Sequence, residues 1–330
     1  PGEVVDGSGC TLLPGLIGSH VHVLRTADLD KMAAAGVTTA MDMASWPPSL
    51  TASLRDASRD TKADSSPRPV LYSAGILATG PNSRHSQLPD LPKEALLTSP
   101  DQAEAFVIQR ISEGSEYIKL VADDVPGCGP SQETLDALVH SAAARDKKTV
   151  VHAAAYEGFR KAVACGADCV THLPKDQVVD AEWAKQLAAQ KRVVCPTLVT
   201  MKTLISNDDR RPDFGYCLAS LKILVKAGVQ ILAGTDAVDA PFMQIEHGTS
   251  MHQELVLMRE AGIEDVDVLR SATSLPAQFW ALEGRGAIRP QAYADLLLVR
   301  GEPDRDIKHI AHVEGVWIGG RKLGGERVVT

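Results

Sequence analysis

Two histidines stand one residue apart in the stretch LLPGLIGSHVH, at the point where an apolar run ends. His20 and His22 would share one face of an extended strand, because successive side chains of a strand point to opposite faces. Two imidazoles on one face can bind a single metal ion, and imidazole is a common ligand of Zn²⁺ and its divalent neighbours. An isolated His-x-His pair is nevertheless a weak indication, so further ligands must be found elsewhere.

Four more residues that could bind a metal ion occur in or at the ends of later apolar runs: Lys119, His152, His172 and Asp236. Taken singly, a histidine such as His152 is more often a hydrogen-bonded core residue than a ligand. Chance placement becomes a poor explanation once six such residues fall at five strand ends. The set together therefore predicts a metal centre.

Lys119 is the most informative member of the set. In EYIKLVAD it lies in the middle of an apolar run, where burial makes a charged amine costly. One reading is that its amine extends to solvent or pairs with a buried acid. The other is that an amine with a lowered pKa reacts with CO₂, and the resulting carbamate bridges two metal ions.

The elements that must position these residues alternate regularly along the chain. Eight β-branched, apolar runs are expected to be strands: 15–20, 37–43, 69–74, 117–122, 149–152, 169–172, 192–198 and 230–233. Helical stretches lie between them, such as 131–146, which opens on a capping serine, and 214–228, which ends on Gly228.

Eight β-then-α units indicate a parallel sheet closed into a (β/α)8 barrel, the α/β class of fold. An open doubly wound sheet is the alternative, but it would normally carry a Gly-rich phosphate loop after the first strand, which GLIGSHVH does not supply. Active sites of such barrels lie at the carboxyl ends of the strands, where the six candidate ligands fall.

Both chain ends depart from this alternation. Residues 1–13 and 284–330 contain short strand-like pieces separated by Gly and Pro, and are expected to form a small β-sandwich domain beside a barrel of residues 14–283. The sandwich is expected to be incomplete at its N-terminal side, so that missing strands or a neighbouring subunit would cover its edges.

Composition excludes several classes of partner. A net charge of −8 without a basic cluster argues against nucleic acid and anionic membranes, and no apolar run reaches the length of a membrane span. The six cysteines show no CxxC pair or disulfide framework, so reduced thiols and a cytoplasmic location are expected. We expect a small-molecule substrate and a homo-oligomer.

Several stretches resemble the metal-dependent amidohydrolase superfamily over nearly the whole chain. LLPGLIGSHVH looks like the family's PGLIDxHxH signature, YIKL resembles its carboxylated-lysine strand, and LAGTDA its aspartate strand. The segment 150–174 is similar to the family's paired-histidine segment, and GAIRPQAYADLLLV to the segment returning to the β-sandwich. The branch most resembled contains Xaa-Pro dipeptidase-like, imidazolonepropionase-like and ochratoxinase-like enzymes. One departure is Gly18, where the family usually has Asp.

The resemblance implies a binuclear centre, most simply of two Zn²⁺ ions. His20, His22, Lys119 and Asp236 would bind the more buried ion, and carboxylated Lys119, His152 and His172 the second. It also implies that a metal-bridging hydroxide attacks the carbonyl of an amide or peptide, with Asp236 as the catalytic proton carrier.

Substrate contacts are predicted from position in the chain and, for His252, from its resemblance to a family position on the eighth helix. The loop after the third strand carries Arg84 and His85, which could meet a substrate carboxylate, while Tyr156 and His252 are further candidates. Three other functions stay open. They are a mononuclear deaminase, a lactam or lactone hydrolase on the same scaffold, and a barrel that has lost catalysis and serves as a scaffold protein.

Overall fold

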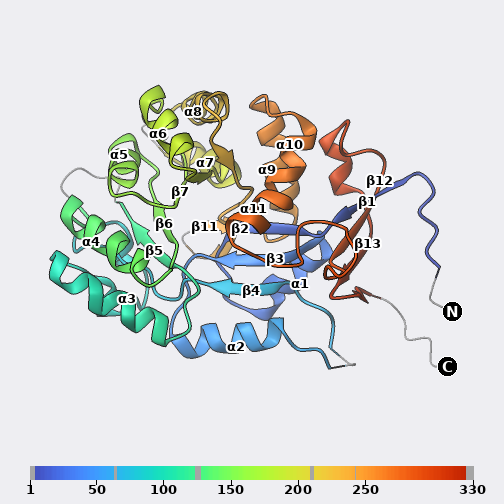
Figure 1. The fold of residues 1–330 in the computed structure, drawn as a ribbon, viewed down its shortest axis with the longest axis horizontal. Helices are drawn as coiled ribbons and strands as arrows, with labels where there is room; N and C mark the ends of the chain where they lie inside the picture. The colour runs from blue at the N-terminus through green and yellow to red at the C-terminus, as the bar shows by residue number, and fades with distance from the viewer. Residues whose placement is uncertain (1–3, 63–64, 123–127, 209–211, 242, 325–330) are drawn as a thin grey trace.

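A computed structural model describes residues 4–62, 65–122, 128–208, 212–241 and 243–324. Eight parallel strands run through its centre in chain order, in two sheets (Figure 1). Three strands form the first sheet: β2 (Leu16–Val21), β3 (Val37–Asp42) and β4 (Val70–Ser73). Five form the second: β5 (Ile118–Val121), β6 (Thr149–His152), β7 (Cys169–Thr171), β8 (Val193–Cys195) and β9 (Gln230–Ile231). All eight expected strands are present, and the α/β class is confirmed.

Helices cover the outer faces of both sheets (Figure 1). The longer ones are α1 (Thr26–Ala34), α2 (Pro48–Ser58), α3 (Ala103–Ser112), α4 (Gln132–Ala143), α5 (Tyr156–Ala164), α6 (Ala181–Ala189), α7 (Leu198–Ser206), α8 (Phe214–Lys226) and α9 (Thr249–Glu260). Two short helices follow, α10 (Asp265–Ser271) and α11 (Ser274–Phe279). Strands β2, β3 and β5 are buried along their whole length, as strands of a parallel sheet covered on both faces are.

The two sheets meet at both of their edges. Val21 pairs with Ala237 in a parallel bridge, and Ser19 N donates to Ala233 O, which joins β2 to the chain after β9. At the other edge Ala78 bridges to Leu120 of β5. These contacts join the edges of the two sheets, and closure of all eight strands into one barrel stays a prediction.

Two expected helix ends are confirmed. Ser131 precedes α4, and its Oγ accepts a hydrogen bond from Thr134 N, so it caps the helix. α8 ends at Lys226, and Gly228 follows with φ +87°, the left-handed conformation that glycine adopts most readily after a helix.

One expected strand was placed too far along the chain. Residues 192–198 were expected to be extended, but β8 ends at Cys195 and α7 begins at Leu198. Thr197 between them has φ +47°, so the chain turns sharply here. An apolar run alone does not separate a buried strand from the buried first turn of the helix that follows it.

The two chain ends share a four-stranded antiparallel sheet in the order β1 (Cys10–Pro14), β12 (Leu296–Arg300), β13 (Val313–Ile318) and β14 (Arg321–Lys322). Asp295, which is buried just before β12, pairs with Arg285 and accepts from Gly319 N. A complete sandwich and a separate domain of 1–13 with 284–330 stay predictions, and residues 1–3 and 325–330 lie outside the described part.

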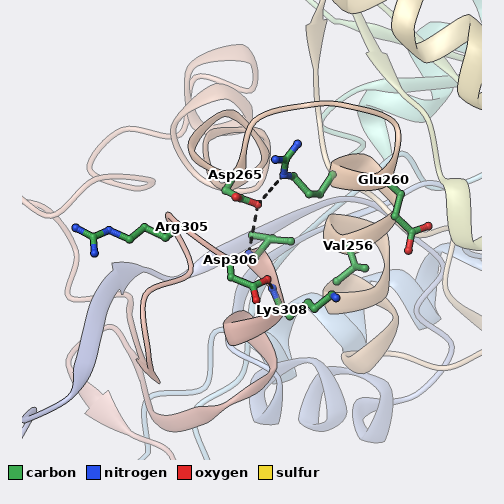
Figure 2. A pocket seen from close by; sticks show the side chains of 8 residues that line it. Val256, Glu260, Asp265, Arg305, Asp306 and Lys308 are labelled. Atoms are coloured by element: carbon green, nitrogen blue, oxygen red, sulfur yellow. Dashed lines mark hydrogen bonds and ion pairs between the residues drawn. The ribbon is translucent and has the colours of Figure 1, made fainter.

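A charged hollow lies on the surface where α9 and α10 meet the 3₁₀ helix η4 (Ile307–Ala311) (Figure 2). Asp265 holds this junction together: it contacts Arg259 Nε at 3.3 Å and accepts from Ile307 N. The wall of the hollow is formed by α9, α10 and the segment around η4, and among the described residues no strand end lines it. The hollow therefore marks the place where the C-terminal segment packs against the helices.

All six cysteines are free thiols, as expected. Within the described residues, every helix is too short or too polar to cross a lipid bilayer.

Candidate metal centre

The first ligand group gathers at the ends of β2 and β9. His20 Nε2 lies 3.1 Å and His22 Nε2 3.0 Å from the same oxygen, Oδ1 of Asp236. Asp236 follows β9 in a left-handed conformation, φ +57°, and its N–H donates to His20 O, which fixes the carboxylate beside the two rings. Three ligand atoms within 4.8 Å of one another can bind one ion.

The second group lies on the neighbouring strands β6 and β7. His152 Nδ1 and His172 Nε2 approach to 2.9 Å, so two ring nitrogens face one point. The His172 ring also lies 5.1 Å from that of His20, centroid to centroid, which places the two groups side by side. The strand ends therefore bring together the five predicted imidazole and carboxylate ligands.

Lys119 completes the set from the centre of β5. Its side chain is 2% exposed, and Nζ has no hydrogen-bond partner among the described residues. Burial lowers the pKa of this amine to about 8. A buried amine without a partner is costly to maintain, and carboxylation would convert it into a group that two metal ions can share. The donor set fits a divalent metal centre.

Hydrogen bonds at the opposite ring nitrogen orient three of the histidines. His20 Nδ1 lies 2.7 Å from Thr171 Oγ1, His22 Nδ1 lies 3.2 Å from Ala44 O, and His172 Nδ1 contacts Thr197 Oγ1. A proton on Nδ1 leaves the Nε2 lone pair of each ring facing the centre, the usual arrangement of metal-binding histidines.

Burial sets the protonation of the ligands. It lowers the pKa of His20 to about 3, with a further contribution from the nearby Lys119 amine, and it lowers the pKa of His172 well below its usual range. Burial alone would raise the pKa of Asp236, but the charge and hydrogen bonds of the adjacent histidines hold it well below its ordinary value. Near neutral pH His20 and His172 are neutral imidazoles and Asp236 is a carboxylate, as ligands must be. Burial alone would lower the pKa of His22 too, but the hydrogen bond and charge of Asp236 raise it.

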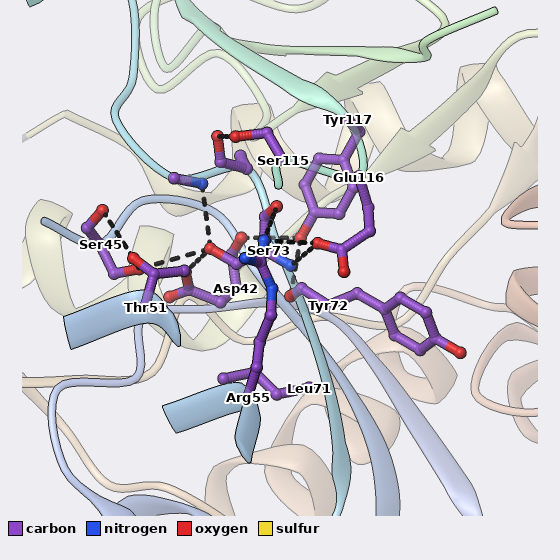
Figure 3. Close-up of polar contacts among 12 residues, drawn as sticks. Asp42, Ser45, Thr51, Arg55, Leu71, Tyr72, Ser73, Ser115, Glu116 and Tyr117 are labelled. Atoms are coloured by element: carbon purple, nitrogen blue, oxygen red, sulfur yellow. Dashed lines mark hydrogen bonds and ion pairs between the residues drawn. The ribbon is translucent and has the colours of Figure 1, made fainter. Parts of the chain in front are cut away.

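A buried polar network supports the strand ends beside the centre (Figure 3). Asp42, the last residue of β3, accepts from Val23 N at 3.0 Å and from the Ser73 hydroxyl of β4. Tyr117 donates to Asp42 O at 2.7 Å. Because Val23 directly follows His22, the Asp42 carboxylate fixes the chain where β2 leaves the ligand group.

Gly18, the departure from the family signature, faces away from the ligands. A Cβ there would meet Met251 Cε at 3.5 Å and Met32 Cε at 3.7 Å, both on covering helices. The missing Asp therefore removes no ligand.

Of the four residues expected to contact substrate, His85 lies against a candidate ligand and His252 lies away from the ligands. The His85 ring packs edge to face on His152, 4.4 Å between centroids, and the exposed Arg84 precedes it. Tyr156 begins α5, donates to Asp180 and packs on Trp183. His252 is buried on α9 with Nε2 2.8 Å from Ala35 O, at the opposite end of α1 from the ligands.

Sequence reasoning missed Thr171, Thr197 and His247, which contact the candidate ligands, and Glu254, which accepts from the first turn of α7 next to Thr197. Threonines at strand ends carry no periodic signal. A signal did exist for Glu254, because an acid between Met251, Leu255 and Met258 lies on the apolar face of α9.

The parallel α/β fold carries four histidines and an aspartate at its strand ends and a lysine within β5, an arrangement that fits a divalent metal centre. The model of the amidohydrolase family matches residues 11–323, and the chain belongs to this family. It is an enzyme that acts on C–N bonds. A search of curated proteins finds no match.

Solved structures of similar fold include three hydrolases. A Xaa-Pro dipeptidase has TM-score 0.81 and 24% identity, covering 96% of this chain and 87% of its own. Ochratoxinase of A. niger has TM-score 0.77 and 19% identity, with coverage of 94% and 83%. Phenylurea hydrolase B has TM-score 0.77 and 18% identity, with coverage of 97% and 86%. At these identities the likeness concerns the fold.

Proposed function

We propose that this chain is a binuclear amidohydrolase that cleaves the amide or peptide-type C–N bond of an N-acyl amino acid, a dipeptide or a related amide. The observation that carries the proposal is Lys119, a buried amine without a hydrogen-bond partner in the described part of the chain. It acts electrostatically on the ligands of both groups, on His20 and Asp236 as well as on His172. A mononuclear centre has no use for such a residue.

The ligands divide into two sets. His20, His22 and Asp236 would hold one divalent ion, His152 and His172 the other, and carboxylated Lys119 would bridge them. When bound, the ions supply an activated water and a Lewis acid for the substrate carbonyl. Zn²⁺ suits imidazole and carboxylate ligands.

Asp236 is the proton carrier of the proposed reaction. Its carboxylate is ionised and buried beside two imidazoles, so it can accept the proton of the attacking water. The same proton then passes to the leaving nitrogen as the C–N bond breaks, which releases a neutral amine and a carboxylic acid, and the acid then loses its proton to solvent. One carboxylate thereby serves as general base and then as general acid.

The substrate end of the site is formed by the loop after β4. The His85 ring lies against His152, so a group held by His85 would sit next to the second ligand pair. Together with Arg84 this side chain could bind the carboxylate of an N-acyl amino acid or dipeptide, which favours these substrates over neutral lactams or lactones.

Metal content and a substrate screen test the proposal together. The enzyme purified with Zn²⁺ and bicarbonate is expected to hold two ions per chain by elemental analysis. It is also expected to hydrolyse some members of a panel of N-acyl amino acids and dipeptides. One ion per chain with deamination of purines or pyrimidines would favour the deaminase. Absence of both ions and turnover would favour the scaffold protein.

A further inference from the structure

Glu254 is a fully buried acid of α9 that takes no part in the proposed reaction. Its Oε1 accepts from Leu198 N at 2.8 Å and its Oε2 from Val199 N at 2.9 Å. These are the first two residues of α7, whose N–H groups have no partner within the helix itself. Both carboxylate oxygens are therefore used to cap a neighbouring helix.

The N-terminus of α7 would ordinarily be capped by the side chain of its own N-cap residue. Threonine is a favoured residue at the N-cap position, where its hydroxyl accepts from an N–H of the first turn. Thr197 occupies that position in α7, yet its side chain makes no capping hydrogen bond. Its Oγ1 contacts His172 Nδ1 instead. The external cap by Glu254 leaves the hydroxyl available for the histidine.

The turn that Glu254 holds also contacts the chain beside Asp236. Thr200 Oγ1 donates to Thr235 O at 2.7 Å, and Thr235 N donates to His20 O. The first turn of α7 is thus attached to His172 directly and to the first ligand group only through backbone. Its displacement should disturb His172 more than the first group.

We propose that Glu254 is a positioning residue of the second metal site: it caps α7 so that the Thr197 hydroxyl can accept the Nδ1 proton of His172 and keep His172 Nε2 facing the ion. The inference rests on the proposed function, because it takes His172 to be a ligand of a second ion. No other acceptor for the Leu198 and Val199 N–H groups is found among the described residues.

Glu254→Gln is the smallest change that tests this role. A glutamine has one acceptor oxygen, and its NH₂ group would face a backbone N–H, so one capping bond is replaced by a contact between two donors. Glu260→Gln is the matched control, because it makes the same substitution at an exposed position of the same helix.

The full-length variants would be dialysed against graded free Zn²⁺ with bicarbonate present, and ions per chain counted by elemental analysis. Glu254→Gln is expected to bind the second ion about 10-fold or more weakly, the usual effect of losing a group that orients a metal ligand, with little change for the first. Glu260→Gln should match the wild type. Wild-type affinity for both ions in folded Glu254→Gln, or equal weakening of both, would overturn the inference.

A second pair of variants decides the matter if Glu254→Gln does not fold. Thr197→Ala removes the hydroxyl and should weaken the second ion, whereas Thr197→Ser retains it and should restore binding. Unchanged binding in Thr197→Ala would overturn the inference while the binuclear function stood. A wild-type enzyme that holds one ion at every Zn²⁺ concentration would instead overturn the proposed function, and this inference with it.

Discussion

At the scale of single residues, Lys119 decides between one metal ion and two. Lys119→Ala removes the proposed bridge, so metal content and turnover should both fall sharply. Short carboxylic acids such as acetate or propionate should restore part of the activity, because a free carboxylate can occupy the space of the lost carbamate. Elemental analysis and amide hydrolysis would measure the two effects.

A matched lysine variant distinguishes the loss of Lys119 at the metal centre from the loss of one positive charge elsewhere. Lys185→Ala, at an exposed position of α6, should keep the metal content and activity of the wild type. A well-resolved density map with an unmodified Lys119 amine beside two fully occupied metal sites would contradict the carbamate.

A separate prediction concerns Asp236, because we propose that it is both a metal ligand and the proton carrier. Asp236→Asn preserves shape but cannot accept the proton, and turnover should fall about 10²–10⁴-fold, the typical share of general acid–base catalysis. Steady-state kinetics at saturating metal would measure the loss. If turnover stayed near that of the wild type with both sites filled, the proton carrier would have to be another residue.

The candidate ligands could be predicted from the sequence because the end of a strand can be recognised from neighbouring residues along the chain. His20 and His22 follow from the two-residue period of a strand, and His152 closes a short apolar run. The orienting groups could not be predicted in this way. Thr197 comes from a different unit of the fold than His172, and only the packing of α7 brings the two into contact.

At the scale of elements, the alternation of strands and helices was predictable, and the exact ends were not. β9 spans only Gln230–Ile231 because Ala233 N already bonds to Ser271 O, outside the sheet. The short antiparallel pair β10 (Val238–Ala240) and β11 (Met243–Ile245) was not expected either. Three-residue strands that pair only with each other leave too short a pattern to recognise.

The cap of α4 is a prediction that belongs to this scale. Ser131→Ala removes the acceptor for Thr134 N, and we expect a loss of about 1 kcal/mol in the free energy of unfolding. Ser131→Asp, which retains an acceptor at the same position, should lose much less. Chemical denaturation would measure both variants, and equal stability of Ser131→Ala and the wild type would show that this cap contributes little.

At the scale of the whole molecule, buried polar contacts of Asp295 join the sheet made by the chain ends to the loop after α11 and to the start of β2. Asp295 Oδ2 pairs with Arg285 and Oδ1 accepts from Gly319 N at 2.8 Å, so one carboxylate joins the loop before β12 to the turn after β13. Its backbone oxygen accepts from Gly15 N, just before β2. The sequence indicated strands at both ends of the chain, but pairing across nearly 300 residues has no local signal.

Breaking this ion pair should loosen the sheet without affecting the metal centre. Asp295→Asn can still accept from Gly319 N, but it leaves the guanidinium of Arg285, whose side chain is 10% exposed, without its carboxylate. Removing one partner of a buried pair commonly costs about 3–5 kcal/mol. We expect a loss of that order in chemical denaturation, with faster amide hydrogen exchange in β12 and β13.

The double variant Arg285→Met with Asp295→Asn tests the reason for this loss. It removes the lone buried charge and fills the space with an apolar side chain, so stability should recover substantially compared with Asp295→Asn alone. Metal content should equal that of the wild type in both variants, because the ligands lie at the strand ends and contact neither residue. If Asp295→Asn left the exchange of β12 unchanged but lost metal, the sheet of the chain ends would support the centre rather than stand apart from it.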